Sequence, residues 1–173
     1  PITISIDAID SDQTPLIYSF SETGLGSLAT VSNDSSEFTI APTSNYALEG
    51  SFDLTFTASD GINTATSSSS AFTLVNQAPS LSGTGNTYAL ASDGTTTTSV
   101  TLTGSDPEGQ NLIWSASGDA GFNYIATVSN VGNVFTITPS TDTAYARDFG
   151  LTFHVTDGIN TVNSKEVYFS LHF

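Results

Sequence analysis

The chain has 173 residues, of which 38% are hydrophobic, a size and composition that allow one or two small domains with packed cores. It carries 17 acidic residues against Lys165 and Arg147, a formal net charge of −15 that excludes the basic footprint of a nucleic-acid-binding surface and opposes contact with an anionic membrane. The absence of cysteine excludes disulfides, and no apolar run approaches the roughly 18 residues of a membrane-spanning helix.

Alternating apolar and polar residues predict short β-strands along the whole chain. In the first half the inward residues are Ile4 and Ile6, then Leu16, Tyr18 and Phe20, then Phe52, Leu54, Phe56 and Ala58, then Phe72 and Leu74. In the second half they are Val100 and Leu102, then Leu112 and Trp114, then Phe149, Leu151, Phe153 and Val155, then Val167, Phe169 and Leu171. Asp-Gly and Pro-Glu-Gly turns separate the strands, and only residues 140–148 suit a short helical turn.

The second half of the chain repeats the first. Asp60–Thr64 recurs 97 positions later as Asp157–Thr161, while Asp10 matches Asp106 at a spacing of 96, so the second copy contains one inserted residue. The copies are residues 1–76 and residues 77–173. Each complete copy predicts about seven strands, the size of an immunoglobulin-like sandwich, in which Trp114 is expected to pack in the core.

The two copies differ at their beginnings. Residues 79–96 of the second copy have no counterpart before Pro1, so the first copy is expected to lack its first strand. We interpret the chain as a processed product or part of a longer array.

Three motifs carry a resemblance to a known family. They are the turn Asp106–Gly109, the strand Leu112–Ser117 and the strand from Phe149 that ends at Asp157-Gly158. They resemble the cadherin-like and immunoglobulin-like tandem repeats of bacterial surface proteins and phage virion structural proteins. The resemblance covers nearly the whole chain and implies an all-β fold of two tandem immunoglobulin/cadherin-like β-sandwich domains. Members of the family act as spacers, adhesion modules and fibre or capsid-surface ornaments.

Acidic turns recur in both copies and suggest a calcium site. In a sandwich of this topology the loops after the second and sixth strands lie at one end, where carboxylate oxygens could converge as calcium requires. The predicted ligands are Asp10, Asp12 and Asp60 in the first copy and Asp106, Glu108 and Asp157 in the second, with Asn76 at the junction. The cadherin resemblance implies that calcium would stiffen the joint between copies. Ordinary turn chemistry is the alternative, since Asp and Gly favour turns by themselves.

The sequence offers no catalytic constellation that we recognise. The two histidines, His154 and His172, belong to no nucleophile–base motif, and both lack counterparts in the first copy. There is no glycine-rich phosphate loop and no zinc-ligand cluster. We therefore predict that the protein is not an enzyme.

The predicted function is a structural or adhesive repeat module of a larger protein at an extracellular, cell-surface or virion surface, such as a fibre, tail or capsid ornament. Its expected partners are other repeats or subunits of the same assembly and a cell-surface glycan or receptor. One alternative is a carbohydrate-binding module, with Tyr88, Tyr124, Tyr145 and Tyr168 as the aromatic platform. A second alternative is a strand-donating subunit of a surface filament, in which a neighbour supplies the missing first strand.

Overall fold

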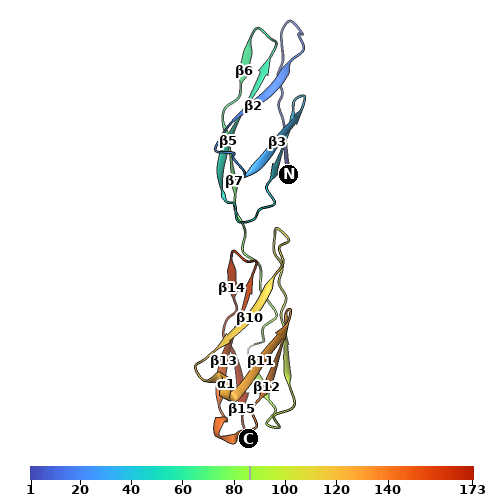
Figure 1. Ribbon diagram of the computed structural model, residues 1–173. Coiled ribbons are helices and arrows are strands. Elements are labelled where there is room, and N and C mark those ends of the chain that lie inside the picture. The colour runs from blue at the N-terminus through green and yellow to red at the C-terminus, as the bar shows by residue number, and fades with distance from the viewer. Residues whose placement is uncertain (86) are drawn as a thin grey trace. The chain divides into compact units, whose positions relative to one another are not determined.

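The computed structural model describes residues 1–85 and 87–173, which form two compact units, Pro1–Asn76 and Gln77–Phe173 (Figure 1). The two are called unit one and unit two below. Both are β-sandwiches, which confirms the predicted fold class of two tandem immunoglobulin/cadherin-like domains.

Unit one consists of two sheets. Its strands are β1 (Ile2–Ser5), β2 (Ile17–Thr23), β3 (Ala29–Asp34), β4 (Glu37–Pro42), β5 (Gly50–Ser59), β6 (Thr64–Thr66) and β7 (Ser70–Leu74). One sheet has the order β1-β4-β3, and the other has β5 at its centre with β2 on one side and β6 and β7 on the other.

Unit two repeats this arrangement and adds a strand. Its strands are β8 (Thr87–Leu90), β9 (Thr98–Thr101), β10 (Ile113–Gly118), β11 (Ala126–Val131), β12 (Val134–Pro139), β13 (Asp148–Thr156), β14 (Thr161–Asn163) and β15 (Val167–Leu171). One sheet has the order β11-β12-β9, and the other has the order β10-β13-β15-β8, with β14 also paired to β13. The additional strand β8 pairs parallel with β15, whereas the other pairs are antiparallel.

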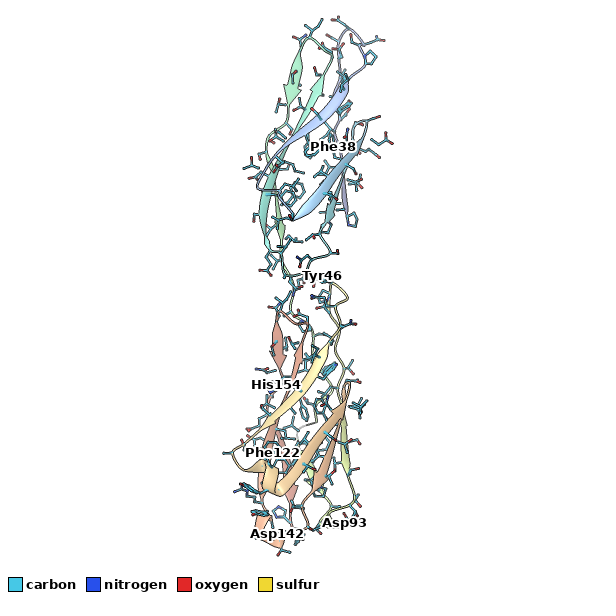
Figure 2. All side chains as sticks on the ribbon, viewed as in Figure 1. Phe38, Tyr46, Asp93, Phe122, Asp142 and His154 are labelled. Carbon is cyan, nitrogen blue, oxygen red and sulfur yellow. The ribbon has the colours of Figure 1, made fainter. Side chains whose placement is uncertain are left out.

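The central strands bury alternate side chains because successive residues of a strand point to opposite faces of its sheet. In β13 the buried hydrophobic side chains are Phe149, Leu151, Phe153 and Val155, as the alternation predicts. Phe153 packs against Phe135 of the opposite sheet with ring centroids 4.8 Å apart, and the matching rings of unit one, Phe56 and Phe38, are 4.7 Å apart. Figure 2 shows Phe38 between the two layers of unit one. Burying each such ring stabilises the fold by about 1.5–3 kcal/mol.

An asparagine links the two sheets of each sandwich. In unit two the side-chain amide of Asn130 in β11 donates to the carbonyl oxygen of Trp114 in β10 at 3.3 Å and to that of Gly132 at 3.0 Å. In unit one the equivalent Asn33 donates to Tyr18 at 3.4 Å and to Ser35 at 3.5 Å. The repeated Thr-Val-Ser-Asn sequence is therefore repeated in structure as a link between sheets.

In each unit a serine bridges the gap between the last two strands, β6 and β7 in unit one and β14 and β15 in unit two. The hydroxyl of Ser164 accepts the backbone N–H of Phe153 at 2.9 Å, and the backbone N–H of Ser164 donates to the carbonyl of Phe153 at 2.8 Å. Ser67 makes the same two bonds with Phe56 in unit one. Because this hydroxyl replaces a missing ladder acceptor, β14 and β15 run along one edge of β13 as a single interrupted strand.

Two short helices interrupt the strands of unit two. A 3₁₀ turn at Thr143–Tyr145 lies within the predicted residues 140–148, and its N-cap Asp142 accepts the backbone N–H of Ala144 at 3.0 Å. The α-helical turn α1 (Phe122–Ile125) was not predicted, because four residues are too short to show helical periodicity. It lies between β10 and β11, the part of the second copy that holds the inserted residue.

Candidate functional site

The acidic turn after β9 is held by its own aspartate. The Oδ1 atom of Asp106 accepts the backbone N–H groups of Glu108 and Gln110, both at 2.9 Å, and its carbonyl oxygen accepts that of Gly109 at 3.2 Å. Glu108 in turn uses Oε2 to accept the backbone N–H of Gln77 at 3.3 Å. The Asp106 carboxylate thus shapes the turn, and the Glu108 carboxylate holds Gln77 at the start of the unit.

The β13–β14 hairpin is built in the same way. Oδ1 of the buried Asp157 accepts the backbone N–H groups of Ile159 at 2.7 Å and Asn160 at 2.6 Å. In unit one, Asp60 does the same with Ile62 at 2.7 Å and Asn63 at 2.5 Å. These backbone N–H bonds favour the charged carboxylate and lower the pKa of Asp60 below its usual value.

Unit one has the counterpart of the Asp106 turn just before its second strand, β2. Oδ1 of Asp10 accepts the backbone N–H groups of Asp12 at 2.8 Å and Thr14 at 3.1 Å. Asp10 and Asp60 line one shallow pocket of about 190 Å³, which Asp12 does not line. The turns of Asp10 and Asp60 therefore lie beside one pocket, and calcium binding by Asp10, Asp12 and Asp60 remains a prediction.

The two acidic turns of unit two lie at one end of their sandwich (Figure 1). The reason is the antiparallel register of β10 and β13, which places Ile113, just after the first turn, opposite Thr156, just before the second. Within residues 1–85 and 87–173, however, no three or more His, Cys, Asp or Glu side chains gather closely enough to form a metal site by themselves. Calcium binding by Asp106, Glu108 and Asp157 remains a prediction.

Two oxygen atoms of this end of unit two lack hydrogen-bond donors in the described part of the chain. Oδ2 of Asp106 and Oε1 of Gln110 are both inaccessible to solvent and accept no hydrogen bond. Buried polar atoms are normally paired, so two unpaired acceptors within one turn call for a donor or a cation. Both are hard oxygen ligands of the kind that calcium prefers.

A row of hydrogen-bonded polar side chains crosses the outer face of unit two, where Figure 2 labels His154. Nε2 of His154 in β13 lies 2.7 Å from the hydroxyl of Ser117 in β10, and Nδ1 lies 2.7 Å from Oδ1 of Asn163 in β14. No sequence motif indicates this row, because its members lie far apart in the chain and only the strand pairing brings them together.

The row has the connectivity of a nucleophile, a base and an orienting group, yet its surroundings do not suit acyl transfer. Ser117, His154 and Asn163 project side by side from one face of a sheet, whereas the backbone N–H groups of these strands point along the plane of the sheet. An oxyanion hole needs N–H donors aimed at a reacting oxygen. The row is best explained as cross-strand pairing on a polar sheet face.

The four tyrosines proposed as a sugar platform do not share one surface. Tyr88 is half-buried and stacks on Phe169 in the core at 5.1 Å, so its assignment to an exposed platform is wrong. Tyr168 is exposed, and its hydroxyl donates to Glu166 at 2.6 Å, which raises the tyrosine pKa. Tyr124 and Tyr145 stack on each other at 5.5 Å near α1.

No helix in the described residues is long and apolar enough to cross a membrane. Searches with protein-family models and among curated proteins found no match.

Solved structures similar to the chain include cadherin-domain proteins and a glycoside hydrolase. The EC1-2 fragment of human protocadherin-24 is 14% identical over 98% of this chain and 86% of its own, with a TM-score of 0.39. The protocadherin GammaB4 extracellular domain is 17% identical over 91% of this chain and 27% of its own, with a TM-score of 0.43. An endo-fucoidan hydrolase of glycoside hydrolase family 107 is 19% identical over 98% of this chain, which spans 25% of the hydrolase, with a TM-score of 0.39.

Proposed function

We propose that the chain is a non-enzymatic structural or adhesive repeat module of a larger extracellular, cell-surface or virion-surface protein. The observation that carries this proposal is that both units employ equivalent polar side chains to hold the same sandwich. The equivalent pairs are Asn33 and Asn130, Ser67 and Ser164, Asp10 and Asp106, and Asp60 and Asp157. A repeated fold whose polar groups maintain its own geometry is typical of an array that spaces or displays.

Surface labelling tests the location. Antibodies raised against the purified chain are applied to intact and to permeabilised cells or particles of the source. We expect labelling of intact material, at an intensity similar to that after permeabilisation. Labelling that appears only after permeabilisation would contradict the proposal.

The Ser117–His154–Asn163 row allows a sharp test of the non-enzymatic part. Hydrolysis of p-nitrophenyl acetate by the chain should not exceed that of an equal concentration of exposed imidazole, and Ser117→Ala should leave it unchanged. Ser129→Ala, on an exposed part of β11, is the matched control. A rate that falls by a hundredfold or more in Ser117→Ala alone would identify a catalytic serine.

We further propose that the acidic end of unit two binds calcium. Oδ2 of Asp106 and Oε1 of Gln110 would supply two buried ligands, and Glu108 and Asp157 lie in the same pair of turns. Calcium would neutralise part of the net charge of −15 and occupy acceptors that the fold leaves without donors. Among the described residues of unit one, no similar pair of buried oxygens supports the corresponding ligand set.

Calorimetry with calcium and with EGTA tests this site. Calcium at a hundred times its dissociation constant should stabilise unit two by about 2.7 kcal/mol, and Asp106→Asn should abolish the increase. Asp142→Asn is the control, since this carboxylate caps the 3₁₀ turn and is outside the predicted ligand set. Equal melting temperatures with calcium and EGTA would leave turn chemistry as the whole role of these acids.

A further inference from the structure

One edge of unit one carries an apolar groove. Its volume is about 180 Å³, and three residues of β7 are part of its lining. The residues that line it are mostly hydrophobic and come from both sheets: Pro1, Ile2, Leu28, Ala29, Ile40, Pro42, Phe52, Phe72, Thr73 and Leu74. Among the described strands, β7 pairs only with β5, so its outer edge offers backbone groups to a further strand.

Unit two has a strand at the equivalent place. Its β15 corresponds to β7 at a spacing of 97 residues, and β8 pairs parallel with it, with Phe169 opposite Tyr88 and Leu171 opposite Leu90. The ring of Tyr88 stacks on Phe169 at 5.1 Å with an interplanar angle of 13°. Phe169 also stacks on Phe149 at 5.3 Å, so three rings form one column.

Unit one contains the same column without its third ring. Phe52 and Phe72, the counterparts of Phe149 and Phe169, stack at 5.1 Å with an interplanar angle of 11°. The groove lies against both of these rings. Unit one therefore has the two stacked rings that receive Tyr88 in unit two, with no third ring stacked on Phe72 among the described residues.

The burial of the last strand differs accordingly. In unit two Phe169 and Leu171 are both 0% exposed, whereas their counterparts Phe72 and Leu74 in unit one are only half-buried. Both pairs point to the interior of their sandwich, so the difference lies in what covers them. A strand equivalent to β8 would remove this apolar surface from water at about 25 cal/mol per Å².

We propose that the groove is a strand-acceptor site, occupied by a β-strand of the same repeat type from outside residues 1–173. The strand runs parallel to β7 and carries an aromatic residue where unit two has Tyr88 and an aliphatic residue where it has Leu90. Backbone hydrogen bonds to the edge of β7 give affinity, and the aromatic and aliphatic side chains of the added strand set its register. This goes beyond the proposed function because it names the chemistry of a partner.

The β8 strand of a second copy is a less favourable occupant. Leu90 is buried and Tyr88 half-buried in unit two, so moving them to another chain would open a groove there as large as the one it filled. A strand from outside residues 1–173 that is not already paired within another unit covers unit one at no such cost.

The first experiment delivers the strand in trans. A synthetic peptide of residues 84–92 is titrated into the ¹⁵N-labelled chain, with a Tyr88→Ser, Leu90→Ser peptide as the control. We expect amide shifts at Phe72, Thr73 and Leu74 with the native peptide only. The equivalent residues of β15 serve as an internal control and should not shift, because β8 already pairs with them.

The second experiment delivers the strand in cis. Residues 79–97 are fused directly before Ile2 in place of Pro1, which reproduces the connection between β8 and β9 in unit two. The melting temperature of unit one should rise by roughly 5 °C or more, and the same fusion with the two serines should give no rise. A response in either experiment supports the site, and a response in the fusion alone identifies delivery through the same polypeptide. No response in both, or equal responses with the serine variants, would overturn the proposal.

Discussion

At the scale of single residues, the two units differ most clearly where the backbone takes a positive φ. Gln13 (φ 59°) and Ser35 (φ 53°) adopt this conformation in unit one, and glycines occupy the equivalent places in unit two, Gly109 (φ 80°) and Gly132 (φ 56°). L-residues pay about 1–2 kcal/mol for the left-handed region, whereas glycine enters it without a steric cost. The first copy therefore carries strain at two turns that the second copy relieves.

Exchanging these residues between the copies should exchange the strain. Ser35→Gly should stabilise unit one by about 0.5 kcal/mol, because the relief of strain exceeds the entropy that glycine adds to the unfolded chain. Gly132→Ser should destabilise unit two by about 1 kcal/mol for the opposite reason. Urea unfolding of both variants measures the two changes, and destabilisation by Ser35→Gly would show that the serine conformation carries no strain.

The stability of unit two should depend on the ionisation of Asp93, which lies between β8 and β9. Its carboxylate accepts Thr96 Oγ1 at 2.5 Å and the backbone N–H groups of Thr96 at 2.7 Å and Thr95 at 2.8 Å, which lower its pKa from 3.8 to about 2. Because the folded pKa is depressed, the stabilisation is complete above pH 4 and is lost as the pH falls through 2.

A charge-removing variant tests this dependence. Asp93→Asn should lower the melting temperature of unit two at pH 6, and the difference from the native chain should shrink as the pH falls from 4 through 2. Asp34→Asn, in an exposed hairpin of unit one, serves as the control. A difference that stays constant between pH 6 and pH 2 would mean that ionisation of Asp93 contributes nothing.

At the scale of the elements, an asparagine joins the two sheets of each sandwich, from β3 in unit one and from β11 in unit two. Asn130→Ala removes both bonds of its amide, to Trp114 and to Gly132, and should destabilise unit two by about 1 kcal/mol. Thermal unfolding measures the change. The control Ser129→Ala, at the neighbouring exposed position of β11, should stay within about 0.5 kcal/mol, and an equal loss in both variants would assign the effect to the strand surface.

At the scale of the whole molecule, the two units have unequal cores. Among the described residues, thirteen buried side chains form the central cluster of unit two, against six in unit one. Part of the difference follows from β8, which contributes Leu90 and covers Phe169 and Leu171. We therefore expect unit one to be the less stable half of the chain.

Matched core substitutions should show whether the two units unfold independently. We expect two calorimetric transitions, with unit one melting first. Leu54→Ala should lower the melting temperature of the first transition only, and Leu151→Ala that of the second only. Each substitution should reduce the free energy of unfolding of its own unit by about 2–5 kcal/mol, since both leucines are fully buried at equivalent positions of β5 and β13. A single transition shifted by either substitution would show that the units unfold as one body.

The sequence by itself determined the architecture. Alternation of inward residues, as in Phe149 to Val155, predicts strands because the side-chain period of a strand is two, and the internal repeat predicts two equivalent sandwiches. It also located the acidic turns, because Asp10, Asp60, Asp106 and Asp157 stand in local turn sequences whose hydrogen bonds reach only two to four residues away.

Only the tertiary structure decided which distant residues meet. The Ser117–His154–Asn163 row depends on the register of three strands, and the placement of Tyr88 in the core depends on β8 joining β15 from 81 residues away. The groove of unit one also depends on tertiary structure, since strand pairing determines which edge of a sheet is left uncovered. Local patterns specify the period and turns of a strand, whereas its neighbours are selected by packing across the whole unit.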